Sequence, residues 1–225
     1  MVAERIADIE RRITAACERA GRPRTDVRLV AVTKTQPADV VNAAIAAGLV
    51  DIGENRVQEY RGKCDALLPH RFHMIGRLQA NKVRHIVDVV HLIHSVDSLE
   101  LAREIDRRAA AIGRVVDILL QVHTSAEETK AGVAADEAED VARALATLPW
   151  VRVRGLMTIG SLVDEAELVR PEFRLLRALR ERLAPLFPAG QCSELSMGMT
   201  GDFEVAIEEG ATMLRIGSAL FGPRA

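Results

Sequence analysis

The stretch VRLVAVTKTQPADVVNAAIAAGLVDIG (27–53) contains one complete unit of the fold that we expect for this chain. Its first eight residues form a short, Val-rich apolar run, which is typical of a buried strand. Pro37 favours the start of the Ala-rich helix that follows, and Gly48 favours its end. The run VDIG (50–53) then predicts the next strand.

Strands and helices keep alternating along the rest of the chain. The eight predicted strands are residues 27–34, 50–53, 72–76, 89–96, 115–123, 151–159, 193–198 and the first part of TMLRIGSALFG (212–222). Because each is followed by a helical segment, we expect a parallel sheet. Eight such units favour a closed (β/α)8 barrel, a TIM barrel of the α/β class, over an open doubly wound sheet. An open sheet usually carries a GxGxxG or P-loop motif after its first strand, and this sequence has neither.

An extra helix is predicted ahead of the barrel. Ile6, Ile9 and Ile13 recur at the spacing of a helix with one apolar face. We therefore expect a single domain over residues 1–225, made of a leading helix over 1–20 and the barrel over 27–222.

The composition excludes several classes of protein. Of the 225 residues, 48% are hydrophobic and 28% are charged, which suits a large core rather than a disordered chain. The formal net charge of −2 gives no general attraction to nucleic acid or to an anionic membrane. No apolar stretch approaches ~18 residues, and the start MVAERIADIERR lacks the apolar core of a secretory signal. The three cysteines form no CxxC pair, so we expect a cytoplasmic protein.

Lysine is rare in this chain. There are 26 Arg and only four Lys, at positions 34, 63, 82 and 130. Lys34 ends the first predicted strand, at a barrel mouth that is partly shielded from water. Desolvation disfavours the ammonium and exposes a nucleophilic amine, which is what Schiff-base chemistry with a carbonyl requires. The alternatives are that Lys34 extends into solvent or pairs with Glu54; for Lys82 and Lys130 we expect solvated positions.

Glycine and serine follow the last two predicted strands. SMG (196–198) ends the seventh strand, and RIGS (215–218) ends the eighth. The loops after these two strands are the usual phosphate site of a TIM barrel. Glycine lets backbone N–H groups approach an anion, and serine hydroxyls add donors. These residues are therefore candidates for a phosphate site; the alternative is ordinary turn glycines and helix-capping serines.

We expect neither a metal site nor a serine nucleophile. His91 and His94 are three residues apart within a predicted strand, which would point them to opposite faces. His70 and His73 have no Cys or carboxylate partner at a metal-ligand spacing. No GxSxG elbow is present.

Eight motifs occur in order along the chain: AVTKTQP (31–37), GENRVQE (53–59), FHMIGRLQANK (72–82), IHSVDS (93–98), EETKAG (127–132), GLMTIG (155–160), LSMGMTGDFEVAIEEG (195–210) and LRIGSALFG (214–222). Together they resemble the pyridoxal phosphate homeostasis protein family, whose barrel is similar to the N-terminal domain of alanine racemase. Two departures concern residues near the predicted site: Gln36 stands where the family often has Lys, and Thr200 where Ser is frequent.

The resemblance implies a barrel of fold type III that binds pyridoxal 5′-phosphate (PLP) as an internal aldimine on Lys34. Arg215 would lie beside the pyridine nitrogen. Because Arg has no acceptor to offer and stays cationic, it would disfavour protonation of that nitrogen and weaken PLP as an electron sink. The phosphate would be held by Ser196, Gly217 and Ser218, the ring would be lined by Asn55, and Met197 would add a backbone or packing contact.

The function implied by the resemblance is to hold PLP for intracellular vitamin B6 homeostasis, without catalysis beyond reversible Schiff-base formation. One alternative is an amino-acid racemase; it would need a tyrosine and a second domain, and the only tyrosine, Tyr60, is predicted away from the mouth. Another is a Schiff-base lyase for sugar phosphates, with Glu54 or His123 as the acid or base. The expected partners are PLP and PLP-dependent apoenzymes, and a monomer is expected.

Overall fold

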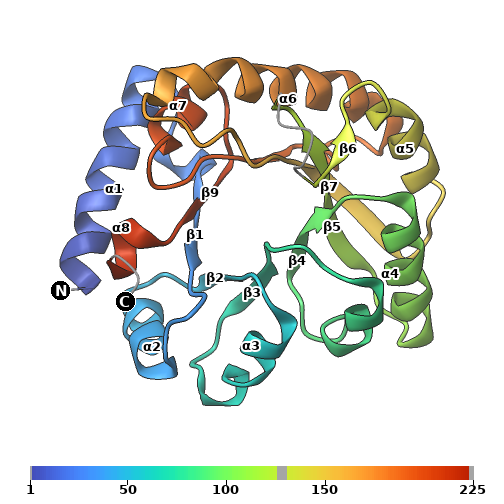
Figure 1. The fold of residues 1–225 in the computed structure, drawn as a ribbon, viewed down its shortest axis with the longest axis horizontal. Coiled ribbons are helices and arrows are strands. Elements are labelled where there is room, and N and C mark those ends of the chain that lie inside the picture. The colour runs from blue at the N-terminus through green and yellow to red at the C-terminus, as the bar shows by residue number, and fades with distance from the viewer. Residues whose placement is uncertain (1, 126–130, 223–225) are drawn as a thin grey trace.

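Eight parallel strands close into a barrel in the computed structural model of the chain, which describes residues 2–125 and 131–222. The strands follow the pairing order β4–β3–β2–β1–β9–β8–β7–β5, and a pairing between β4 and β5 closes the ring (Figure 1). They are β1 (Arg28–Val32), β2 (Asp51–Glu54), β3 (Arg71–Met74), β4 (Leu92–Val96), β5 (Val116–His123), β7 (Val151–Met157), β8 (Glu194–Ser196) and β9 (Met213–Ile216). The predicted TIM barrel is thus confirmed.

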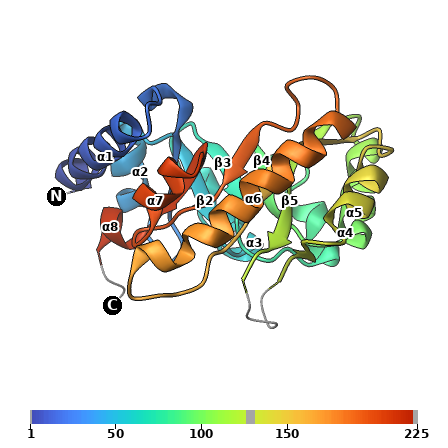
Figure 2. The ribbon, with the colours of Figure 1, turned by 90° about the horizontal axis from the view of Figure 1, so that it is seen from above.

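Helices surround the strands on the outside of the ring (Figure 1). They are α1 (Val2–Arg19), α2 (Ala38–Ala46), α3 (Val57–Arg61), α4 (Leu99–Ala111), α5 (Ala138–Leu145), α6 (Arg170–Leu183), α7 (Phe203–Glu208) and α8 (Ser218–Phe221). The predicted leading helix is α1, and its buried face includes Ile6, Ile9 and Ile13. This face packs against α7 and α8, the last helices of the chain, so α1 covers the point where the barrel begins and ends (Figure 2).

Two predicted helices are shorter than expected. The helix predicted after the second strand, which the sequence extends to about Leu68, ends at Arg61 in α3, and a single 3-10 turn (Cys64–Ala66) follows Gly62. The helix predicted over QANKVRHIVD (79–88) is a 3-10 helix, Ala80–His85. Beyond it, the Arg114 guanidinium donates to the carbonyls of Val87 and Val90 at 2.6 and 2.5 Å, so these acceptors are used by tertiary contacts.

The structure also contains short elements that the sequence pattern did not predict. A two-residue strand, β6 (Val133–Ala134), pairs in parallel with the end of β5. Another is the 3-10 turn Arg24–Asp26, whereas the 3-10 turns Ala166–Val169 and Ala184–Leu186 flank α6 within the helix that the sequence predicts over residues 165–187. Such short pieces depend on their neighbours more than on their own sequence, because one or two turns bury little apolar surface.

The barrel has an inner and an outer set of strand side chains, because successive residues of a strand face opposite sides. Outward-facing side chains such as Ala31, Ile52 and Phe72 belong to the large core shared with the helices. A separate apolar cluster fills part of the interior and consists of Leu92, Leu119, Met157 and Met213. The rest of the interior includes buried polar groups, which are important for the site.

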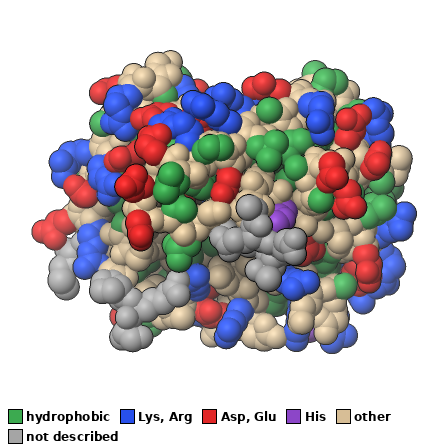
Figure 3. Space-filling model, turned by 45° about the horizontal axis from the view of Figure 1, so that its top comes forward, with side chains coloured by type: hydrophobic (Ala, Val, Ile, Leu, Met, Phe, Trp, Pro, Cys, Tyr) green, Lys and Arg blue, Asp and Glu red, His purple; other side chains and the backbone are tan. Residues whose placement is uncertain are grey.

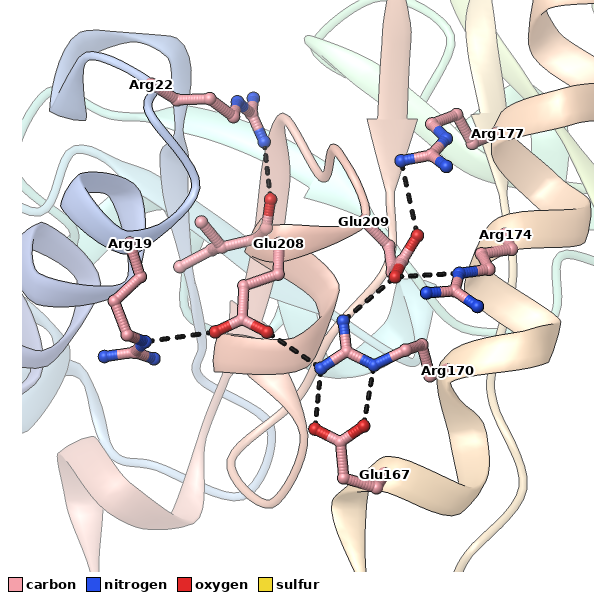
Figure 4. Close-up of polar contacts among 9 residues, drawn as sticks. Arg19, Arg22, Glu167, Arg170, Arg174, Arg177, Glu208 and Glu209 are labelled. Carbon is pink, nitrogen blue, oxygen red and sulfur yellow. Dashed lines mark hydrogen bonds and ion pairs between the residues drawn. The ribbon is translucent and has the colours of Figure 1, made fainter.

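An ion-pair network ties α1 and α6 to α7 (Figure 4). Arg170 on α6 binds Glu208 and Glu209 at 2.8 and 2.9 Å, and Arg19 on α1 binds Glu208 at 3.1 Å. Glu209 is only 5% exposed and also faces Arg174 and Arg177. Exposed ion pairs contribute little singly, but a network around a buried carboxylate holds its helices in one arrangement.

The surface carries acidic and basic side chains side by side, as the face in Figure 3 shows. This mixture matches the formal net charge of −2. Within the described ranges, none of the helices combines the length and the apolar character needed to cross a membrane.

Candidate functional site

A cavity of about 740 Å³ opens at the carboxyl ends of the strands. This is the end of a TIM barrel where functional groups gather. Five of the seven predicted binding residues line this cavity: Lys34, Asn55, Arg215, Gly217 and Ser218. The other two, Ser196 and Met197, are fully buried and are not among the described residues that line it.

Lys34 stands in a strained turn directly after β1. The Gln36 amide donates to the Thr33 carbonyl at 3.1 Å, which closes the turn. Thr35 has a φ of +65°, a left-handed conformation that is rare for a β-branched residue, and its amide donates to the Glu59 carboxylate. Such strain is typically found at functional positions, where surrounding contacts hold it.

Glu54 is bound by groups outside the cavity. Its Oε1 atom accepts from Lys63 Nζ at 2.6 Å and from Thr33 Oγ1 at 2.5 Å. Its Oε2 atom has no hydrogen-bond partner in the described part of the chain, and burial raises the pKa of this carboxyl. Neither Glu54 nor His123, the two candidates for acid–base work on a sugar phosphate, is among the described residues that line the cavity.

Asn55 is held in place by the close approach of another backbone. A Cβ atom on Gly76 would lie 2.4 Å from the Asn55 carbonyl oxygen, so only glycine fits there without a shift. The Gly76 carbonyl accepts from Ser95 Oγ at 2.6 Å. The ends of β2, β3 and β4 therefore fix the backbone that carries Asn55.

Hydroxyl groups and glycine form one end of the cavity. Ser218 Oγ lies 3.1 Å from Thr200 Oγ1, and Gly217 precedes Ser218 in the same wall. A Cβ atom on Gly217 would lie 3.2 Å from Val32 Cβ, so a side chain there would be crowded. Hydroxyls and exposed backbone N–H groups suit an anion such as a phosphate. Thr200 lines this end but was not among the predicted residues, although it lies in the loop after the seventh strand, where phosphate sites occur.

Arg215 on β9 presents a buried guanidinium to the cavity. Its NH1 group donates to Ser196 Oγ at 2.7 Å and its NH2 group to the Thr158 carbonyl at 2.7 Å. Burial lowers the pKa of Arg215 to about 10, so it remains protonated near neutral pH. Ser196 thus supports Arg215 from inside the barrel.

Two histidines lie behind Ser196. His94 Nδ1 is 2.8 Å from Ser196 Oγ, and His94 Nε2 is 2.9 Å from His73 Nδ1. His73 Nε2 lies 2.9 Å from Asp51 Oδ1, and Arg71 binds both oxygens of Asp51. The expectation that His73 lacks a carboxylate partner is therefore wrong. The local pattern did not show it because Asp51 comes from the neighbouring strand.

His91 differs from expectation as well. Strand β4 begins at Leu92, so His91 precedes it and lies at the opposite end of the barrel from the cavity. Its ring centroid is 5.2 Å from that of His73, and Asp51, His73 and His91 bring one ligand atom each to within 4.8 Å of one another. Arg71 already occupies both Asp51 oxygens, which opposes a cation at this position.

Tyr60 and Lys82 lie away from the described cavity lining. Tyr60 is buried on α3, stacks on Phe72 at 3.6 Å between ring centroids, and its hydroxyl lies 3.2 Å from His70 Nε2. It does not belong to the described cavity lining. Lys82 is half-buried on the 3-10 helix Ala80–His85, whereas Lys130 lies outside the described residues.

Comparison with known proteins places the chain in a family. A model of the alanine racemase N-terminal domain family matches residues 5–225. The pyridoxal phosphate homeostasis protein of Aquifex aeolicus is 46% identical over 98% of this chain and 97% of its own length. That of Pseudomonas aeruginosa is 43% identical over 99% of this chain and 96% of its own length.

A solved structure points to the same family as these relatives. PipY of Synechococcus elongatus with PLP bound has a TM-score of 0.84 and 37% identity, and the match covers 99% of this chain and 100% of that one. The match of fold, full length and sequence shows that this chain belongs to the pyridoxal phosphate homeostasis protein family.

Proposed function

We propose that this chain binds PLP in the cavity at the carboxyl ends of its strands and takes part in intracellular PLP homeostasis. The observation that carries the proposal is the meeting of three groups in one cavity: an amine (Lys34), a cationic donor (Arg215) and a cluster of hydroxyls and glycine (Thr200, Gly217 and Ser218). These groups match the aldehyde, the pyridine nitrogen and the phosphate of PLP. The PLP-bound structure of a relative that is 37% identical supports this choice of ligand.

Each group has a role that its chemistry suits. The Lys34 amine would hold PLP covalently through its aldehyde, and the strained turn after β1 keeps Lys34 in the cavity lining. The hydroxyls of Thr200 and Ser218 donate to the phosphate together with the backbone at Gly217. Asn55 lines the ring. Ser196, predicted as a phosphate ligand, accepts a hydrogen bond from Arg215, and Met197 is fully buried.

Arg215 makes this site better suited to holding PLP than to using it in catalysis. When bound, PLP supplies a reactive aldehyde and an electron sink whose strength depends on the protonation of its ring nitrogen. A guanidinium beside that nitrogen has no acceptor atom and does not take up a proton. Arg215 would therefore leave bound PLP a weak electron sink for carbanion chemistry.

The enzymatic alternatives find less support in the cavity. A racemase of this barrel type needs a second proton-transfer group opposite the lysine, and the Tyr60 hydroxyl is directed at His70. A sugar-phosphate lyase needs an acid or base beside Lys34, and Glu54 is engaged by Lys63 and Thr33. We propose a monomeric cytoplasmic carrier that passes PLP to apoenzymes.

The test is to incubate the protein with PLP, record its visible absorbance, reduce it with borohydride and map the labelled peptide. We expect a visible band and a single label on Lys34. Lys34→Ala should remove both while leaving the thermal unfolding midpoint unchanged, because Lys34 is not part of the core. Lys82→Ala is the matched control and should keep both. Label spread over several lysines, or no band in the unmodified chain, would refute the proposal.

A further inference from the structure

A line of hydrogen-bonded side chains crosses the barrel interior from the cavity to the opposite end. It runs from Arg215 through Ser196, His94 and His73 to Asp51, with donor–acceptor distances of 2.7, 2.8, 2.9 and 2.9 Å. These residues come from five strands, β9, β8, β4, β3 and β2. The line therefore joins most of the ring to the guanidinium that faces the cavity.

The two ends of the line determine the direction of every hydrogen bond in it. A guanidinium can only donate, and an ionised carboxylate can only accept. Although burial on its own raises the pKa of Asp51, hydrogen bonds from His73 and Arg71 hold it well below its usual range, so Asp51 is ionised. Arg215 then donates to Ser196 Oγ, and at the other end Asp51 accepts from His73 Nε2.

The groups between these ends are left with one consistent arrangement of protons. A neutral His73 that donates from Nε2 must accept at Nδ1, so His94 donates from its Nε2 atom. His94 Nδ1 is then an acceptor, and it receives the Ser196 hydroxyl proton. Ser196 Oγ therefore has its lone pairs available to Arg215.

Burial enforces this arrangement of protons. Ser196, His94 and His73 are all fully buried, so water cannot replace a lost partner. Burial lowers the pKa of both histidines, which keeps them neutral. The charged and titratable groups that act on the pair are Arg28 on β1, Asp51 on β2, Arg71 on β3, His91 before β4 and Arg215 on β9; all except Asp51 disfavour a histidinium.

We infer that Asp51, His73, His94 and Ser196 form a one-way hydrogen-bond relay that holds the Arg215 guanidinium in its orientation toward the cavity. His94 and Asp51 are thereby positioning residues for the pyridine side of bound PLP, although neither lines the cavity. This role in PLP binding rests on the proposed function, whereas the proton order of the relay does not.

The proton order is tested in the protein without PLP. Two-bond ¹⁵N–¹H correlation NMR distinguishes the two neutral forms of histidine and the charged form. We expect both His73 and His94 to be neutral and protonated at Nε2 throughout pH 5–8. An Nδ1-protonated or charged form of either ring would overturn the relay, whether or not the chain binds PLP.

The positioning role is tested in the PLP-loaded protein. His94→Leu removes both hydrogen bonds of His94. We expect PLP to dissociate about tenfold faster, as the loss of a charge-assisted contact implies. We also expect the pH profile of the visible PLP band to shift. His94→Gln keeps one donor and one acceptor and should restore most of both properties. Leu119→Ala is the control, because it truncates a fully buried side chain of the same interior and leaves the relay intact.

The outcomes separate the relay from a general loss of stability. Both His94→Leu and Leu119→Ala should lower the thermal unfolding midpoint, but only His94→Leu should change the pH profile of the band. Equal spectral changes in the two variants, no change in either, or no rescue by His94→Gln would overturn the positioning role. A missing band in the unmodified chain would instead refute the proposed function, and the NMR result would then decide the relay alone.

Discussion

Replacing Gly76 by Ala tests the close backbone contact that positions Asn55. The added Cβ would lie 2.4 Å from the Asn55 carbonyl oxygen and 2.6 Å from its Cα, whereas ordinary contacts begin at 3.4 Å. One of the two backbones must therefore move by about 1 Å, and both are held by hydrogen bonds at the strand ends. Overpacking of this kind costs ~1–3 kcal/mol.

The cost is measured by urea unfolding. With a slope of ~2 kcal/mol per molar, Gly76→Ala should lower the urea midpoint by ~0.5–1.5 M. It should also weaken PLP binding, because Asn55 is displaced from the cavity wall. Gly201→Ala is the matched control: Gly201 lines the same cavity, but a Cβ there would meet nothing within 4 Å. Equal urea midpoints for the two variants would refute the claim that Gly76 is required by close approach.

Three further predictions concern other features. Thr35→Asn should raise stability by ~1 kcal/mol in thermal unfolding, because Asn tolerates the left-handed conformation better; a lower midpoint would contradict the assigned strain. Arg215→Met should shift the visible band of bound PLP, and an unchanged band and affinity would remove Arg215 from the ring's surroundings. Hydrogen bonds from Arg170 lower the pKa of Glu208; burial offsets part of this shift, and a hydrogen bond from Arg19 adds to it. The ionised Glu208 therefore contributes its full stabilisation above the usual carboxyl pKa, and this stabilisation is lost as the pH falls through the lowered pKa. Glu208→Gln should therefore flatten the acid limb of a stability–pH curve, and an unchanged limb would contradict this role.

Much of the site could be predicted because a barrel places its functional groups by a simple rule. Parallel strands bring their carboxyl ends to one mouth, so residues directly after apolar runs meet there. Lys34, Arg215, Gly217 and Ser218 were found in this way, whereas Asn55 was implied by the family resemblance; all five line the cavity. Ser196 and Met197 follow the same rule in sequence, but β8 is short and both side chains are buried.

Secondary structure was predictable where segments were long and strongly periodic. Helix α1 and the strands lie close to their predicted positions, since burial of one face or of a whole strand leaves a clear pattern. The segments around residues 64–66 and 80–85 were harder, because a few residues of 3-10 helix leave no clear periodic pattern in the sequence.

The sequence by itself determined the alternation of strands and helices, the mouth at which polar groups gather and the lysine that stands there. These features are local, since each depends on a run of ten to thirty neighbouring residues. Only the tertiary structure decided that Asp51, His73, His94 and Ser196 form one line. The strand register sets Gly53 opposite His73, and His73 opposite Leu92. This register places the side chains of Asp51, His73 and His94 in the barrel interior, and closure of the barrel brings Ser196 on β8 to them. Hydrogen-bond partners between strands follow from register and closure, which no local pattern specifies.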